Sequence, residues 1–175
     1  MAAFTIDMSS PLRASAFTSD LGGPGGGTHG PGEWYNHFGM DLGAPAGSEV
    51  RAAFDGHITR LNPHIPSTDT SGSYGAEVFV RAHNDRMGGF YTHITNVPSA
   101  LAIGSTVSRG DRLGDVMAFP GVPTHVHWAL VEIIGGLPGG TYKGVNLHGS
   151  FVAATRSDST LAVTFHQNGS APAAI

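Results

Sequence analysis

The chain has 175 residues, 40% of them hydrophobic, and a net charge of −4 at pH 7. That length suits one domain that can bury its own core. Lys143 is the only lysine, and the sequence has no basic patch of the kind that binds phosphate backbones, so we expect no nucleic-acid partner. The lack of cysteine excludes disulfides and cysteine-ligated zinc, and no apolar run reaches the length of a membrane span.

The N-terminal part of the chain is expected to be a segment, residues 1–29, that packs on the rest of the domain. Its first 20 residues lack the basic and then apolar regions of a secretory signal. The run "LGGPGGGTHGPGEW", residues 21–34, is too rich in glycine and proline for a helix or a central strand. It predicts a glycine-rich loop.

Short strands separated by turns follow this loop. "EVRAAFDGHITRL", residues 49–61, alternates on both sides of Asp55-Gly56, a pair typical of hairpin turns. "AEVFVRAH", residues 76–83, is rich in β-branched and aromatic residues and predicts a strand. The turn "NDRMGG" leads it back into "FYTHITNV", which predicts a second hairpin.

The rest of the chain continues this pattern. "HVHWALVEI", residues 125–133, predicts a strand, and only residues 98–102 could form a helical turn. We expect a mainly β fold: an antiparallel, sandwich-like core over residues 30–140, with glycine-rich loops around a groove and few or no helices. In the tail, residues 141–175, "TLAVTFHQ" alternates as a strand does, which predicts a packed β extension.

The most suggestive short motif is "HVHW". Successive strand residues point to opposite faces, so His125 and His127 share one face about 7 Å apart, while Val126 and Trp128 face the core. Two histidines at that separation can reach one metal centre. They could equally form a solvent-facing polar stripe.

Two further motifs carry chemistry. In "HFGMD", an extended segment puts His37 and Asp41 on one face, with Gly39 leaving room between them; both are ordinary zinc ligands, although a turn with a capping Asp41 would explain the motif as well. In "FYTHI", His93 shares its strand side with Tyr91 and could be a half-buried histidine bonded to backbone. A catalytic zinc site needs three protein ligands and an open position, and His37, Asp41 and one of the "HVH" pair would supply them.

Taken in order, "H-x-x-x-D", a glycine-rich hairpin, "Y-x-H-I", "G-x-x-V-x-x-G-D-x-L-G" and "H-x-H" resemble the lysostaphin-type zinc endopeptidases, metallopeptidase family 23, over roughly residues 30–135. The resemblance implies that His37, Asp41 and His127 bind zinc. It also implies that His93 and His125 flank the metal as catalytic residues, one as base and the other as donor to the oxyanion, in an order that the sequence leaves open.

The resemblance further implies a peptidase that hydrolyses peptide bonds in peptidoglycan stems or cross-links, acting at the cell envelope. The approach to "H-x-H", here "FPGVPTHVH", departs from the family's usual Gly-Ser/Thr-x-Gly-Pro, which puts substrate preference in doubt. Without a visible signal, a phage-associated or injected setting fits, as does export by another route. The oligomeric state has no signature in the sequence.

Three other functions fit the sequence less well. A metal-free relative that regulates wall hydrolases would have lost ligands, whereas every motif position is filled here. A lipoyl or biotinyl carrier needs a lysine at a hairpin tip, and Lys143 lies far from "GSTVSRGDRLGDV". A phosphate cradle would need the Gly-Lys-Ser/Thr of a P-loop, which is absent.

Six histidines match no family motif and are interpreted as ordinary surface or structural residues. They are His29, His57, His64, His83, His148 and His166. His29 stands apart from the other five because its glycine-rich loop is expected to overhang the site.

Overall fold

The computed structural model describes residues 1–62, 74–118 and 120–175, and it is mainly antiparallel β, as predicted. The main sheet has the order β2-β3-β10-β7-β6-β5-β8, with β11 on β10 and with β9 joining β4 to β7. Its strands are β2 (Asp20–Gly22), β3 (Met40–Gly43), β4 (Glu49–Arg51), β5 (Gly56–Asn62), β6 (Ala76–Ala82), β7 (Met87–Thr95), β8 (Thr106–Val107), β9 (Arg112–Val116), β10 (His125–Ile134) and β11 (Thr141–Val145).

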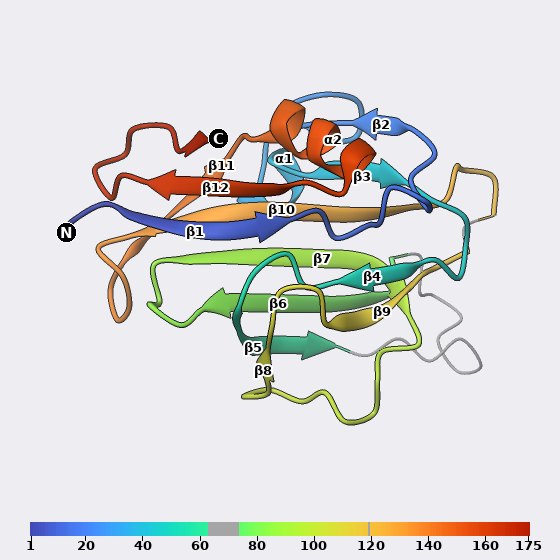
Figure 1. Ribbon diagram of the computed structural model, residues 1–175, viewed down its shortest axis with the longest axis horizontal. Helices are drawn as coiled ribbons and strands as arrows, with labels where there is room; N and C mark the ends of the chain where they lie inside the picture. Colours follow the sequence, from blue (N-terminus) through green and yellow to red (C-terminus); the bar gives the residue numbers. More distant parts are fainter. Residues whose placement is uncertain (63–73, 119) are drawn as a thin grey trace.

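A smaller sheet and two helices complete the described part of the chain (Figure 1). The smaller sheet has the order β1-β12-β13, from β1 (Phe4–Ser9), β12 (Thr160–Phe165) and β13 (Ala173–Ala174). The helices are α1 (Trp34–His37) and α2 (His148–Ser157). No helix of the described residues is long and apolar enough to cross a membrane.

The predicted hairpin between residues 76 and 97 is confirmed, because β6 and β7 pair directly through the turn after Ala82. The hairpin predicted around Asp55 is wrong. β4 pairs with β9, with Val50 opposite Gly114, and β5 pairs with β6 and β8. The reason is burial: Phe54 is fully buried, so the chain crosses the core there instead of reversing at the surface.

Helix α2 was not predicted, and residues 98–102 form a turn instead of a helix. The helix is short, contains Gly149 and carries few strongly apolar residues, so its sequence signal is weak. Tertiary packing stabilises it: Phe151 is fully buried and its ring meets Trp128 edge-on at a centroid distance of 4.6 Å. Asp158 in a left-handed conformation, φ 51°, ends the helix.

The tail is packed against the rest of the molecule at several points. β12 pairs with β1, with Val163 opposite Ile6, and Val163 and Phe165 are fully buried. The backbone N–H of Gln167 donates to the buried Glu132 carboxylate at 2.8 Å. In Figure 1, β12 and β1 run side by side and α2 follows the crossing from β11. The tail therefore contributes to the same core as β10.

Candidate functional site

The site is built on two neighbouring strands, β3 and β10. Their antiparallel register puts Asp41 directly opposite His127, and the two side chains lie on the same face. His127 Nδ1 is 2.9 Å from Asp41 Oδ1. Both residues are buried, with 7% and 6% of their surface exposed. An ionisable pair so withdrawn from water needs further partners.

The ring of His127 is held in one orientation from two sides. Its Nε2 is 2.8 Å from the carbonyl oxygen of Tyr35 in α1, which fixes Nε2 as the nitrogen that carries the hydrogen. A Cβ atom at Gly39 would overlap the ring. Gly39 therefore provides the space that the sequence suggested, and the His127 ring occupies it.

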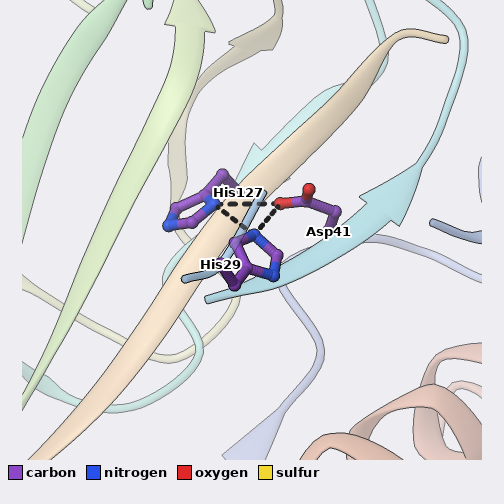
Figure 2. Close-up of side chains that lie close together, drawn as sticks. All are labelled: His29, Asp41 and His127. Carbon is purple, nitrogen blue, oxygen red and sulfur yellow. Dashed lines mark hydrogen bonds and ion pairs between the residues drawn. The ribbon is translucent and has the colours of Figure 1, made fainter. Parts of the chain in front are cut away.

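The third member of the group is His29, from the glycine-rich loop between β2 and α1. Its Nε2 lies 3.2 Å from Asp41 Oδ1 and 3.3 Å from His127 Nδ1. Its Nδ1 is 3.0 Å from the carbonyl oxygen of Gly23 and donates to it. Only 2% of His29 is exposed. Figure 2 shows the three side chains converging from the loop, β3 and β10.

The hydrogen-bond pattern decides what this group can hold. Because the outer nitrogens of His29 and His127 donate to carbonyl groups, the nitrogens that face inward carry lone pairs when the rings are neutral. Asp41 adds an acceptor oxygen. The three inward atoms lie within 4.8 Å of one another, so three acceptors face one point. Such an arrangement can hold a cation, and nitrogen and carboxylate oxygen are ligand atoms that suit zinc.

The electrostatics of the site agree with this donor set. Burial by itself would raise the pKa of Asp41. When the histidines are protonated, the hydrogen bond that His127 donates and the positive charges of His127, His125 and His29 outweigh burial, and the pKa of Asp41 lies below its ordinary value. Asp41 is therefore ionised at neutral pH and available as an anionic ligand.

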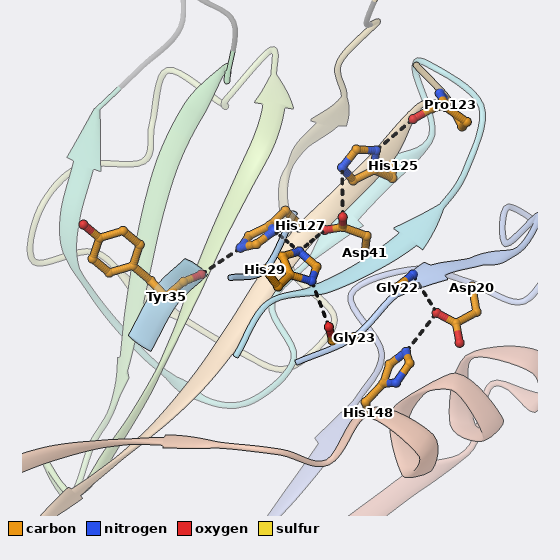
Figure 3. Close-up of polar contacts among 10 residues, drawn as sticks. All are labelled: Asp20, Gly22, Gly23, His29, Tyr35, Asp41, Pro123, His125, His127 and His148. Carbon is orange, nitrogen blue, oxygen red and sulfur yellow. Dashed lines mark hydrogen bonds and ion pairs between the residues drawn. The ribbon is translucent and has the colours of Figure 1, made fainter. Parts of the chain in front are cut away.

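Two more histidines, His125 and His93, flank the group, and Figure 3 shows the first of them. His125 Nε2 is 3.6 Å from Asp41 Oδ2, and its Nδ1 is 2.8 Å from the carbonyl oxygen of Pro123. The His93 ring meets the rings of His125 and His127 at centroid distances of 4.8 and 5.7 Å. The predicted pair of flanking residues is thus adjacent to the Asp41–His127 pair.

His93 reaches this position through a backbone irregularity. Strict alternation would leave His93 on the side of Tyr91, which is fully buried in the core, and that expectation is wrong. His93 has a left-handed backbone, φ 64°, which turns its ring to the side of His127. The backbone N–H of His93 and its Nδ1 both contact the carbonyl oxygen of Tyr74, at 2.8 and 3.0 Å.

Burial dominates the protonation of His93. It lowers the pKa of His93 to about 4, although the hydrogen bond to the Tyr74 carbonyl opposes the shift. The neighbouring His125 and His127 add to the lowering. His93 is therefore neutral at pH 7. Since its Nδ1 donates to Tyr74, the proton-accepting nitrogen of the neutral ring is Nε2.

His37 lies outside the converging group. It is the last residue of α1, its Nδ1 is 3.2 Å from the carbonyl oxygen of Gly30, and its ring meets Phe38 edge-on at 4.9 Å. Asp41 and His127, from the predicted ligand set, belong to the group, and His29 stands where His37 was expected. The only sequence signal for His29 was its loop, which was expected to overhang the site.

Of the histidines interpreted as ordinary, three more make described contacts with other side chains. His57 and His83 stack on each other at 5.9 Å, away from the site. His148 Nε2 lies 2.8 Å from Asp20 Oδ1, next to the loop that carries His29. His64 falls outside the described residues, as does Phe119 in the approach to His125.

The chain matches the model of a known protein family. Residues 35–138 match the model of peptidase family M23, and the chain therefore belongs to that family. No curated protein sequence matches the chain. His29, which lies before residue 35, and the tail beyond residue 138 fall outside the matched range.

Solved structures share the fold. Lysostaphin from Staphylococcus simulans, described as an antimicrobial peptidase, superposes with a TM-score of 0.56 at 14% identity, over 85% of this chain and 55% of its own. The M23 metalloprotease pseudoalterin, from the deep sea, gives 0.52 at 19% identity over 83% and 76%. A zinc-containing peptidase from Vibrio cholerae gives 0.51 at 16% identity over 70% and 36%. The chain thus spans about a third of the Vibrio protein and about half of lysostaphin.

Proposed function

We propose that the protein is a zinc-dependent endopeptidase that hydrolyses peptide bonds in the stems or cross-links of peptidoglycan. One observation carries the proposal: His29 Nε2, His127 Nδ1 and Asp41 Oδ1 lie within 4.8 Å of one another, and both nitrogens carry lone pairs when the rings are neutral. Membership of peptidase family M23 supports the reaction class and the wall substrate.

The proposed zinc ligands are Asp41, His127 and a third histidine. The convergence of side chains favours His29 as that third ligand. The family motif favours His37, which is four residues before Asp41 in "HFGMD". The two assignments make opposite predictions for single substitutions, so zinc content decides between them. In either case the tautomers of the ring nitrogens are set by backbone carbonyls, as is usual around metal-bound histidines.

Bound zinc would polarise a carbonyl group and make a water molecule acidic enough to act as nucleophile near pH 7. The chain's own residues handle the protons. His93, which is neutral at pH 7, accepts the proton of the attacking water. His125, beside Asp41 Oδ2, hydrogen-bonds the oxyanion that develops on the scissile carbonyl. This assigns the two flanking roles that the sequence left open.

The substrate and location follow from the reaction class. A peptidase for peptidoglycan acts at the cell envelope, in the periplasm or outside the cell, and its partner is the wall peptide. The alternative is a metal-free relative that regulates wall hydrolases, in which protonated histidines instead of a cation would balance the buried Asp41 carboxylate.

The decisive experiment combines metal analysis with product analysis. The purified protein is expected to contain one zinc and to release peptide fragments from defined muropeptides, identified by mass spectrometry; a chelator should abolish release and zinc should restore it. His127→Ala should lose both zinc and hydrolysis. Full hydrolysis by zinc-free protein would overturn the mechanism, and intact zinc binding with no hydrolysis of any muropeptide would overturn the substrate.

A further inference from the structure

The C-terminal tail contacts the loop that carries His29, through the first residue of α2. His148 Nε2 lies 2.8 Å from Asp20 Oδ1, and the same oxygen accepts the backbone N–H of Gly22 at 3.1 Å. One carboxylate thus joins α2 to the start of the glycine-rich loop. Figure 3 shows this contact directly below the histidine group.

Packing strengthens the same connection. A Cβ atom at Gly23 would overlap the imidazole of His148, so the ring lies flush against the loop backbone. Gly23 is also the residue whose carbonyl oxygen accepts from His29 Nδ1, at 3.0 Å. A continuous set of contacts therefore runs from His148 through Asp20 and Gly23 to His29.

Other hydrogen bonds also hold the loop: the backbone N–H of Gly25 donates to the carbonyl oxygen of His37 at 2.9 Å, and His37 Nδ1 is 3.2 Å from the carbonyl oxygen of Gly30. Gly25 and Gly27 have left-handed backbones, φ 74° and 56°, and the described loop contains several more glycines, which lose much conformational entropy when ordered. Holding His29 within bonding distance of Asp41 and His127 therefore depends in part on contacts from outside the loop. His148 and Asp20 supply the contact nearest Gly23, whose carbonyl oxygen accepts from His29.

We propose that His148 is a positioning residue, which holds the glycine-rich loop so that His29 Nε2 meets the metal group, and that the tail thereby forms part of the site. This rests on the proposed zinc function and on His29 as ligand. It assigns a task to residues that lie outside the range matched by the M23 family. The role is indirect, because His148 touches neither the metal group nor the substrate site.

The test is a double-mutant cycle on zinc affinity, measured by competition with a chromophoric chelator. His148→Ala is expected to weaken zinc binding by about tenfold, in the range for residues that orient metal ligands. In a His29→Ala background the same substitution should change nothing, because the ligand it positions is gone. Asp20→Ala should reproduce His148→Ala, and His148→Gln, which can still donate to Asp20, should restore part of the affinity. His83→Ala is the matched control, because His83 directly follows the C-terminal end of β6 and does not belong to the site.

Each outcome decides. Equal zinc affinity in wild type and His148→Ala, with loss in His127→Ala, would overturn the positioning role and leave the zinc function standing. A tenfold loss that persists in the His29→Ala background would also overturn it, since the effect would then be structural. Zinc retention by His127→Ala would instead overturn the proposed function.

A second inference comes from the cavity between β1, β4 and the start of β12. The cavity has a volume of about 330 Å³, and three of the nine cationic lysine and arginine side chains line it: Arg13, Arg51 and Arg109. Asp158 is the only acidic residue in the lining, and its Oδ1 already accepts the backbone N–H of Ala14 at 2.8 Å. In a chain of net charge −4, this is a local excess of positive charge.

The arginines of this cavity are incompletely paired. Arg51 Nε is buried and has no hydrogen-bond partner among the described residues. Arg13 meets Glu49 only at 3.7 Å, and Arg109 donates to the neutral Thr160 hydroxyl at 2.7 Å. Burial lowers the pKa of Arg51, the charge of Arg13 adds to this through repulsion between the two cations, and Asp158 and Glu49 oppose it. An anion in the cavity would relieve that repulsion and fill the donors of Arg51.

We infer that this cavity binds an oxyanion, a phosphate or carboxylate group, independently of the histidine site. The probes are inorganic phosphate and N-acetyl-dialanine with a free or an amidated C-terminus, titrated by calorimetry into chelator-treated protein at constant ionic strength. Phosphate or the free carboxylate should bind saturably. Arg51→Gln and Arg109→Gln should each weaken that binding by about tenfold, while Arg60→Gln and His127→Ala should leave it unchanged.

The two arms distinguish the source of the anion, since only the phosphate arm or only the free-carboxylate arm will saturate if one class is preferred. The absence of saturable binding in both arms would overturn the inference. The inference would also be overturned if neither Arg51→Gln nor Arg109→Gln, which replaces the more exposed arginine, weakened the binding.

Discussion

The two faces of β10 differ in what they do, although their residues alternate along four consecutive positions. Val126 and Trp128 are fully buried, and Trp128 packs between Tyr91 and Phe151. His125 and His127 face the other side, where they meet Asp41 and the ring of His93. Strand alternation thus places the core residues and the site residues on opposite faces of one strand segment about 10 Å long.

The polar groups on the two faces are treated differently as well. On the core face, Trp128 Nε1 is buried without a hydrogen-bond partner among the described residues, a cost that the packing of the large ring offsets. On the site face, the outer nitrogens of His125 and His127 both contact backbone carbonyls. The core tolerates one unsatisfied donor, whereas the site fixes the orientation of each ring. Substitutions on the two faces should therefore have separable effects.

The largest expected effect is on the site face. His127→Ala should reduce zinc affinity and hydrolysis by more than about 100-fold, because even changes to residues behind a metal ligand cost 10–100-fold. The metal-free variant should lose less stability than a variant with a core substitution, since the removed ring packs among the polar side chains of the site and not in the apolar cluster of the core. Zinc analysis and urea unfolding of the same sample check both statements. A strongly destabilised metal-free variant would contradict the separation of the two faces.

The matching change on the core face is Trp128→Ala. It should lower the free energy of unfolding by about 3–5 kcal/mol, the usual cost of removing a large buried aromatic side chain. At a temperature where the variant is still folded, its zinc stoichiometry should remain that of the parent. Urea unfolding gives the first quantity and metal analysis the second. Loss of zinc by a fully folded Trp128→Ala would show that the faces are coupled.

A third comparison sets His29 against His37. His29→Ala should lower zinc affinity by at least about tenfold, because it removes a converging nitrogen, whereas His37→Ala should lower it less, because the His37 ring bonds to Gly30 outside the group. Competition titration with a chelator measures both. The reverse order would establish His37, the histidine of the family motif, as the ligand.

The smallest effect concerns pH. The folded-state pKa of His93 is about 4, below the unfolded value of about 6.5. Between these two values the unfolded chain binds a proton at His93 that the folded protein does not bind. Stability is therefore full above pH 6.5 and declines as the pH falls toward 4, by at most about 3 kcal/mol. Asp41, whose pKa is also lowered, acts in the same direction but below that range. Urea unfolding of metal-free protein at pH 7 and 4.5 checks this; His93→Gln should show a smaller decline.

Local periodicity predicted much of the fold. β6, β7 and the strand from His125 are continuous alternating runs, which local periodicity predicts, and the pairing of β6 with β7 needs only a short turn. The pairing of β4 was predicted wrongly because its partner, β9, lies some 60 residues further along the chain, and no local pattern specifies so distant a pairing. Helix α2 was not predicted for a related reason: the packing of Phe151 on Trp128 stabilises it more than its own composition does.

The sequence by itself determined the family and the mainly β class, because ordered motifs and a two-residue period are local properties of the chain. For the same reason it determined that the histidines of β10 lie on one face and Val126 and Trp128 on the other. The tertiary structure decided three other things. It turned His93 toward the site through a left-handed residue, it brought His29 from a distant loop to Asp41 and His127, and it set His148 against that loop. Each depends on contacts between segments that are far apart in sequence, which residue types and spacings do not encode.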